Sequence, residues 1–261
     1  MDKIFAVANQ KGGVGKTTTS INLAASLAAS RRRVLLIDLD PQGNATMGAG
    51  ADKHQLQKGS YELLTRACSA EEAILRELPG GFHLIGGNGD LVAAEVELVS
   101  AIGRELRLRQ ALRDLREHYD LIIIDCAPSL NLLTLNALVA ADAVIIPMQC
   151  EYFALEGLAA LTDTIEQVAG SINPGLHIAG ILRTMFDPRN TLATDVSAEL
   201  QQHFPRQLFD TIIPRNVRLA EAPAHGKPAL LYDRTSRGSM AYVALAAEVL
   251  RRQESSVVEP A

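Results

Sequence analysis

The sequence predicts the α/β class, with one domain built on a mostly parallel, twisted sheet that has helices on both faces. Unbroken apolar runs at 34–37 and 121–124 are typical of parallel strands that are covered on both sides. Longer segments of helical periodicity alternate with these runs, and a glycine-rich turn joins the first strand to the first helix. Strands and helices in alternation indicate βαβ units.

The first half of the chain supplies four predicted strands, at 4–8, 34–37, 82–85 and 121–125, each a short apolar run. Helices are expected at 20–29, from Ser69 to about 78, and over 91–115. Ser69 and Glu72 have the spacing of a capping box, which marks a helix start. The segment 91–115 shows helical periodicity with many charges.

The second half continues the alternation. Strands are predicted at 143–147 and 176–184, and a strand-to-helix junction at 211–218. Helices are predicted at 131–139, 155–168, 192–204 and 238–252, the last with its apolar residues on one face. We therefore assign residues 1–252 to a single domain and 253–261 to a short disordered tail.

Composition agrees with a cytoplasmic enzyme. The chain has 261 residues, 48% of them apolar and 21% charged, enough for a substantial core. Cys68, Cys126 and Cys150 are too scattered for a disulfide framework or a C-x-x-C metal site. No secretory signal or membrane span is expected, because Met1 leads almost directly into the first strand and polar residues interrupt every long apolar run. With a net charge of −5, any contact with DNA must come from a local patch.

The glycine-rich turn has the composition of a phosphate-binding loop. Glycines let the backbone wrap a polyphosphate, and N–H groups at the start of the following helix point at the anion. Lys16 would neutralise the β- and γ-phosphates, and the Thr17 hydroxyl would bind Mg²⁺. A basic surface loop could share this composition, but its strand and helix flanks favour a single-domain P-loop NTPase. The expected nucleotide-binding residues are Lys11, Gly12, Gly13, Val14, Gly15, Lys16, Thr17 and Thr18.

Carboxylates follow two of the predicted strands. Asp38 and Asp40 come after the run 34–37, and Asp125 ends the run 121–124. Because ligands gather at the carboxyl ends of parallel strands, Asp40 and Asp125 are expected beside the triphosphate, where they would hold Mg²⁺ or position water. Turn chemistry alone would also explain Asp40 before Pro41.

The second lysine makes this loop resemble the deviant Walker A loop of the ParA/MinD class of P-loop ATPases. Gln10 stands where the usual motif has glycine, and Lys11 matches the signature lysine of that class. The resemblance implies that Lys11 acts across an ATP-bound homodimer while Lys16 acts within its own subunit. It also implies that Asp40 positions the attacking water and that Asp125 belongs to a D-x-A-P-S switch. ATP and Mg²⁺ are the implied cofactors.

Later segments resemble chromosomal ParA proteins, also called Soj, more than MinD-like relatives. These segments are 184–189, 212–218 and 221–223. The resemblance implies that Met185, Pro214 and Asn216 lie at the adenine base. It also implies that Arg189 and Arg218 contact DNA. Without the resemblance, the simpler interpretation of both arginines is a solvated surface charge, and for Arg218 a residue at a helix start.

The implied function is DNA partitioning. ATP would close the homodimer, and the dimer would bind nonspecific DNA on the nucleoid. Slow hydrolysis of ATP would then release the protein from DNA. DNA and a ParB-type partner would accelerate this hydrolysis. A ParA-like ATPase that positions another cargo would share this chemistry. A MinD-like membrane-cycling ATPase needs a basic amphipathic C-terminal helix, but 253–261 has two acids and a proline, so no membrane partner is expected. An iron–sulfur carrier needs paired cysteines, and the three scattered cysteines of this chain argue against that function.

Overall fold

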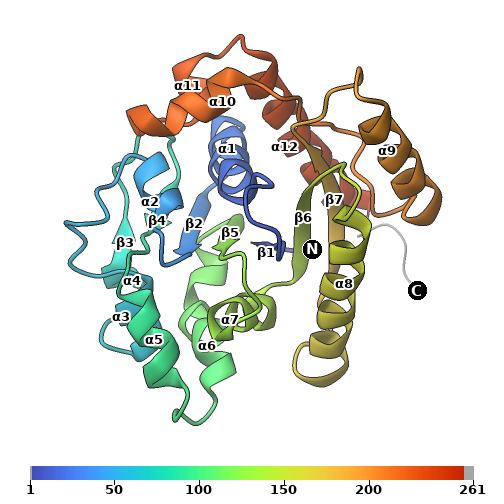
Figure 1. The fold of residues 1–261 in the computed structure, drawn as a ribbon. Coiled ribbons are helices and arrows are strands. Elements are labelled where there is room, and N and C mark those ends of the chain that lie inside the picture. Colours follow the sequence, from blue (N-terminus) through green and yellow to red (C-terminus); the bar gives the residue numbers. More distant parts are fainter. Residues whose placement is uncertain (1, 256–261) are drawn as a thin grey trace.

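The structure, a computed structural model, describes residues 2–255 and is organised on one sheet of seven strands. The strand order is β3-β4-β2-β5-β1-β6-β7 (Figure 1). All neighbouring strands are parallel except β3 and β4, which confirms the mostly parallel sheet. The strands are β1 Ile4–Val7, β2 Val34–Leu39, β3 Ile74–Leu75, β4 His83–Ile85, β5 Leu121–Cys126, β6 Ala143–Gln149 and β7 His177–Thr184.

Helices cover both faces of this sheet (Figure 1). Alternate residues of β1 point to opposite sides: Ile4 and Ala6 join the core under α5–α9, while Phe5 and Val7 join the core under α1 and α12. The helices are α1 Lys16–Ala29, α2 Asn44–Gly48, α3 Ser60–Thr65, α4 Ala70–Ala73, α5 Leu91–Leu98, α6 Arg107–Ala111, α7 Leu132–Ala140, α8 Ala154–Ser171, α9 Thr191–His203, α10 Val217–Glu221, α11 Ala229–Tyr232 and α12 Arg237–Ser255.

Two predicted helices are interrupted by tertiary contacts. The helix from Ser69 ends after Ala73, because Ile74 pairs with Ile85 at the sheet edge as part of β3. The segment 91–115 divides into α5, α6 and two short 3₁₀ turns, at Arg104–Leu106 and Asp114–Glu117. The side chain of Asn136 accepts from the Leu108 N–H at 3.1 Å and donates to the Arg104 carbonyl at 2.9 Å. This amide satisfies backbone groups at the break.

The strand expected at the beginning of 211–218 is absent from the described chain. Ile213 forms only two isolated backbone hydrogen bonds here. Its N–H donates to the Arg183 carbonyl of β7 at 2.9 Å, and its carbonyl accepts from the Phe186 N–H in the following loop at 3.1 Å. Pro214 has no N–H with which to continue a ladder. At the other end of the prediction, α12 continues to Ser255, past the expected end at 252. The remainder of the predicted tail, 256–261, lies outside the described residues.

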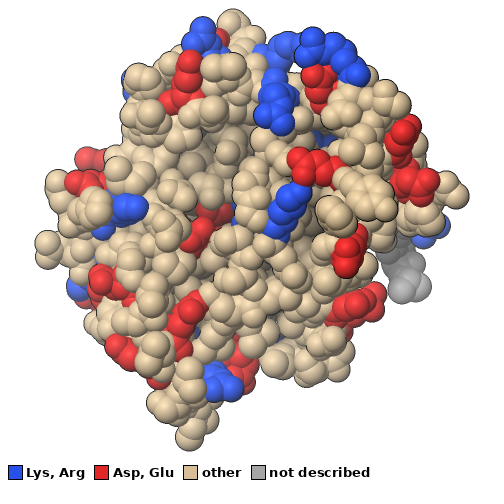
Figure 2. Space-filling model, in the orientation of Figure 1, with Lys and Arg blue, Asp and Glu red and all other residues tan. Residues whose placement is uncertain are grey.

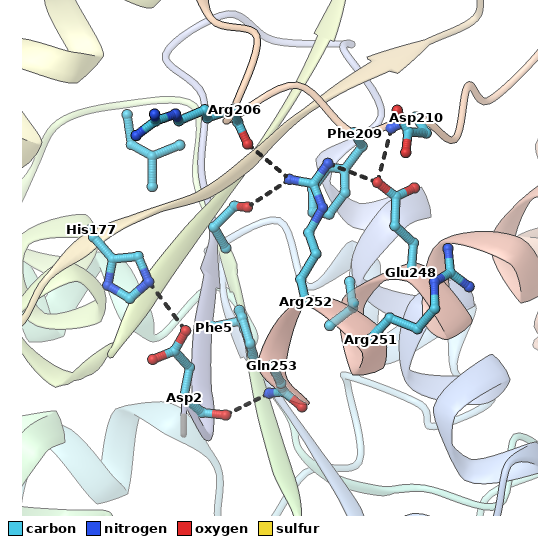
Figure 3. A pocket seen from close by; sticks show the side chains of 13 residues that line it. Asp2, Phe5, His177, Arg206, Phe209, Asp210, Glu248, Arg251, Arg252 and Gln253 are labelled. Carbon is cyan, nitrogen blue, oxygen red and sulfur yellow. Dashed lines mark hydrogen bonds and ion pairs between the residues drawn. The ribbon is translucent and has the colours of Figure 1, made fainter. Parts of the chain in front are cut away.

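Within residues 2–255, no helix combines the length and the apolar character needed to cross a membrane. Helix α12 ends beside the start of β1, and a cavity of about 480 Å³ lies there (Figure 3). There Arg252 stacks on Phe209 with its guanidinium 4.4 Å from the ring centroid, and it pairs with the buried Glu248 at 2.8 Å. This cavity therefore contains the clamp that fastens α12 to the segment after α9.

Candidate nucleotide-binding site

A cavity of about 620 Å³ opens at the carboxyl ends of the central strands, above the glycine-rich turn. Segments far apart in the sequence meet here: the turn, the start of α2, the loop after β7, and α10. Tyr242, from the first half of α12, completes the lining. The lining residues are Gly12, Gly13, Gly15, Lys16, Thr17, Thr18, Asp40, Gln42, Asn44, Pro128, Thr184, Met185, Ile213, Pro214, Arg215, Asn216, Val217, Leu219, Ala220 and Tyr242.

The glycine-rich turn is held open by its backbone conformation and by two neighbouring strands. Gly13 and Gly15 have positive φ values of 75° and 88°, which glycine adopts without strain. The Thr184 hydroxyl, at the end of β7, donates to the Val14 carbonyl at 2.7 Å. The Asn9 side chain accepts from the Lys11 N–H at 2.9 Å and donates to the Pro147 carbonyl at 2.8 Å. The loop is therefore shaped before any ligand arrives.

Lys16 is the buried cation of the site. Only 6% of the residue is exposed, and its ammonium donates to the Lys11 carbonyl at 3.0 Å. Burial lowers the pKa of Lys16, while the nearby charges of Asp125 and Asp40 act against that shift. A polyphosphate in the cavity would supply the anion that a desolvated ammonium needs. This geometry suits the role predicted for Lys16.

Asp125 lies one hydrogen bond behind the cavity wall. Its two carboxylate oxygens accept from the hydroxyls of Thr17 at 2.8 Å and Ser20 at 2.7 Å. Asp125 pairs in register with Asp38 on β2, and both residues are fully buried. Burial raises the pKa of each carboxyl, and the charge of Asp38 raises that of Asp125 further. A divalent cation at Thr17 would relieve this repulsion, and a hydroxyl with carboxylates is an oxygen donor set that fits Mg²⁺.

Asp38 anchors the loop that carries Asp40. Its carboxylate accepts from the N–H of Thr46 at 2.8 Å and its hydroxyl at 2.7 Å, and from the Asp40 N–H at 3.1 Å. Asp40 itself accepts from the Gln42 N–H at 2.9 Å, so the turn chemistry considered for Asp40 is present. Because Asp40 also lines the cavity beside Thr17, the turn and a role at the nucleotide are compatible.

Lys11 does not line the cavity in this structure. Its ammonium forms an ion pair with Glu151, just after β6, and both side chains are about half exposed, at 44% and 50%. The side chain is therefore at the surface, within reach of a second molecule. Val14 also does not line the cavity. Its side chain is buried, and its carbonyl accepts the hydrogen bond from the Thr184 hydroxyl.

The three residues expected at the base come together on one wall. Met185 has a positive φ of 48°, and its sulfur accepts from the Gln149 amide at 2.9 Å. Phe186 forms an isolated bridge with Pro214, which brings the two loops together. The Asn216 side chain accepts from the Arg218 N–H at 3.0 Å as the N-cap of α10. Its amide N–H₂ and one lone pair of its side-chain oxygen therefore remain for a ligand.

Arg189 and Arg218 lie outside this cavity, and each is paired with carboxylates. Arg189 donates twice to Asp187, at 2.9 and 2.7 Å, and its side chain is 88% exposed. Arg218 contacts Glu221 at 2.8 Å and Asp233 at 3.3 Å. These arginines therefore belong to the surface around the site.

Thr184, Glu151 and Arg215 have no role assigned from the sequence, although Thr184 and Arg215 lie within the segments 184–189 and 212–218. Thr184 and Glu151 come at or just after the carboxyl ends of β7 and β6, so the rule that ligands gather at those ends could have singled them out. Arg215 lines the cavity between Pro214 and Asn216. Its place between two residues expected at the base was the signal that could have singled it out.

Comparisons with known proteins show the family of this chain. A family model described as an AAA domain matches residues 2–178. The chromosome partitioning protein ParA of Myxococcus xanthus is 52% identical over 96% of this chain and 88% of that protein. The chromosome-partitioning ATPase Soj of Thermus thermophilus is 52% identical over 97% of each.

A solved structure extends the similarity to the fold. It is described as cobyrinic acid a,c-diamide synthase from Mycobacterium smegmatis with bound ADP and magnesium, and it is 38% identical. It superposes with a TM-score of 0.86 over 98% of this chain and 97% of that one. Sequence, fold and site geometry thus agree: this chain belongs to the ParA/Soj family of chromosome-partitioning ATPases.

Proposed function

We propose that this protein is an ATP-hydrolysing DNA-partitioning protein that uses Mg²⁺. The observation that carries the proposal is the cavity in which the P-loop, Asp40 and the wall of Met185, Pro214 and Asn216 meet. Its volume of about 620 Å³ suits a nucleotide-sized ligand. The relatives named ParA and Soj, at 52% identity, are more similar than the protein named as a diamide synthase, at 38%.

In this proposal the phosphates lie on the N–H groups of 12–18, at the start of α1, where helix-terminal donors favour an anion. Lys16 offers the buried positive charge. The adenine base lies against Met185, Pro214 and Asn216. Thr17 and Asp40 face the cavity and would hold Mg²⁺, with Asp125 fixing Thr17 from behind. The metal would neutralise charge that develops on the phosphoryl oxygens.

Hydrolysis is a phosphoryl transfer to water. Asp40 is the carboxylate at the cavity surface, so we assign it to orient the attacking water. Lys16 stabilises the charge that develops on the γ-phosphoryl oxygens from its own subunit, and Lys11 does so from a partner subunit. In the structure Lys11 is exposed and paired with Glu151, so this role requires that pair to open. Basal turnover is expected to be slow, so that the ATP-bound dimer lasts long enough to bind DNA.

The ATP-bound dimer would then bind nonspecific DNA through Arg189 and Arg218, doubling every phosphate contact, and would associate with the nucleoid. A ParB-type partner would accelerate hydrolysis and so release the DNA. A cargo other than DNA remains an alternative with the same chemistry, and membrane cycling is a further alternative.

Co-sedimentation with DNA and with liposomes, each with ATP, ADP or no nucleotide, tests the proposal. We expect pelleting with DNA in ATP only. Pelleting with liposomes in ATP would instead assign a membrane-cycling role. Failure to pellet with either, in a protein that hydrolyses ATP, would point to another cargo.

A further inference from the structure

Another cavity, of about 420 Å³, lies at the edge of the sheet opposite the nucleotide cavity. Ile4, at the start of β1, and Asp142, just before β6, line it together with residues from α6 and from the ends of α7 and α8. We call it the α6 cavity. Because β1 and β6 are parallel, their amino ends lie away from the carboxyl ends that border the nucleotide cavity. Both cavities can therefore hold a ligand at the same time.

Three arginines line the α6 cavity: Arg109 of α6, Arg113, and Arg116 of the 3₁₀ turn that follows. They are spaced by four and three residues, which brings successive side chains onto one side of a helical segment. Asp142 is the only acid among the described residues that line the cavity, and Asp114 lines a different one. Like charges one turn apart repel, so this cluster costs free energy unless an anion lies beside it.

Asp142 does not supply that anion to all three arginines. Its carboxylate accepts from the backbone N–H groups of Lys3 at 2.7 Å and Ile4 at 2.9 Å, and twice from Arg116, at 2.9 and 3.0 Å. A carboxylate can accept about four hydrogen bonds, so its capacity is used. Asp142 therefore fixes the start of β1 and neutralises Arg116, and Arg109 and Arg113 remain without a carboxylate.

Arg109 and Arg113 retain most of their hydrogen-bond donors. Arg109 donates to the carbonyl of Ile172, at the end of α8, at 3.3 Å, and this bond does not neutralise its charge. Within residues 2–255 the Arg113 side chain has no hydrogen bond or ion pair. A guanidinium carries five N–H donors, and both residues are exposed. A ligand that enters the cavity can therefore reach two unneutralised guanidinium groups.

The positive charge is local to this cavity. Figure 2 shows acidic side chains over α8 and over the side that holds α3 and α5, and the chain as a whole has a net charge of −5. Exposed charges more than about 8 Å apart are largely screened at physiological salt. The arginines therefore act on an anion in contact with them, which favours a small ligand over a long polyanion.

We propose that the α6 cavity binds a small phosphate-bearing anion. Guanidinium forks match phosphate oxygens. A terminal phosphate has three oxygens and can accept from more than one fork, whereas a carboxylate has only two. The volume of about 420 Å³ is in the range of small-molecule sites. The proposal concerns binding alone and goes beyond the partitioning function.

The test is calorimetric titration of the full chain with inorganic pyrophosphate, in saturating ADP and without Mg²⁺. The affinity for pyrophosphate should stay the same when the ADP concentration is raised, because ADP fills the other cavity. Citrate, a carboxylate anion of similar charge, should bind more weakly.

Arg113→Gln should weaken pyrophosphate binding about tenfold, by removing charge-assisted hydrogen bonds. This residue is suited to the test because its side chain has no partner within residues 2–255 whose loss would disturb the fold. Arg76→Gln is the matched control. It removes the same charge from an exposed arginine that is paired with Glu71 elsewhere, and it should bind pyrophosphate like the wild type.

Four outcomes would overturn the proposal. They are no binding of pyrophosphate, an affinity that falls as ADP rises, wild-type affinity in Arg113→Gln, or equal affinity for citrate. The second would assign the binding to the nucleotide cavity. Titration with duplex DNA in ATP addresses a nucleic acid as the occupant: weaker DNA binding by Arg113→Gln with unchanged pyrophosphate affinity would assign the arginines to DNA instead. Because pyrophosphate binding is measured without DNA or ATP, failure of the partitioning function would leave this result standing.

Discussion

The nucleotide cavity and the arginine surface around it are built by opposite means. In the cavity the working groups are buried and already bonded: Lys16 donates to the Lys11 carbonyl, and Asp125 accepts from Thr17 and Ser20. On the surface, Arg189 and Arg218 are exposed and held only by neighbouring carboxylates. Removing one partner of a buried charged group is costly, because the remaining charge is left buried without compensation. Exposed ion pairs, by contrast, contribute little and exchange partners readily. One region is suited to chemistry and the other to reversible contact.

The largest effect is expected at the buried lysine. Lys16→Ala should weaken ATP binding by about 100-fold or more, since it removes the buried cation that faces the phosphates. Equilibrium titration with a fluorescent ATP analogue measures this. Lys11→Ala is the matched control: it should bind ATP within a few-fold of the wild type but fail to dimerise in sedimentation. A stable ATP-dependent dimer of Lys11→Ala would contradict its role across the interface.

Asp40 separates binding from turnover inside the same cavity. Asp40→Ala should bind ATP normally, accumulate as an ATP-bound dimer and hydrolyse about 100-fold more slowly, because a positioning group for water is removed. Single-turnover hydrolysis measures the rate. Asp40→Asn retains an acceptor for the Gln42 N–H and so controls for the turn. If Asp40→Asn hydrolysed ATP at the full rate, Asp40 would be needed only as the hydrogen-bond acceptor in the turn.

The smallest effects are expected on the arginine surface. Arg189→Ala and Arg218→Ala should each weaken DNA binding a few-fold for all sequences alike and leave ATP-dependent dimerisation unchanged. Each should also reduce the slope of log K against log salt by about 0.9 for every DNA phosphate that the variant no longer neutralises. DNA titrations at several salt concentrations measure both quantities.

Asp187 offers the reverse experiment. In the structure its carboxylate accepts two hydrogen bonds from the guanidinium of Arg189. The hydrogen bonds from Arg189 are the main cause that lowers the pKa of Asp187 to about 2. Asp187→Ala should therefore strengthen DNA binding, by freeing Arg189 and removing a negative charge. Unchanged binding in all three variants would place the DNA contact elsewhere.

Much of the site could be read from the sequence because its signals are local. The residues 11–18 are consecutive, and the glycines that shape the turn work through their own φ values. Asp40 and Asp125 follow apolar strands, and parallel strands bring their carboxyl ends to one edge. Met185, Pro214 and Asn216 were named through resemblance rather than from their own pattern, and the structure places them on the same cavity wall.

Only the tertiary structure decided which distant groups meet. Thr184 holds the P-loop across 170 positions of sequence, and Asp38 lies beside Asp125 because β2 pairs with β5. The break within 91–115 depends on Asn136, which reaches in from α7. The pairing of Lys11 with Glu151 likewise joins the P-loop to the end of β6. Local residue patterns determine turns and strand ends, but pairing between elements depends on sheet order and packing, which no short stretch of sequence contains.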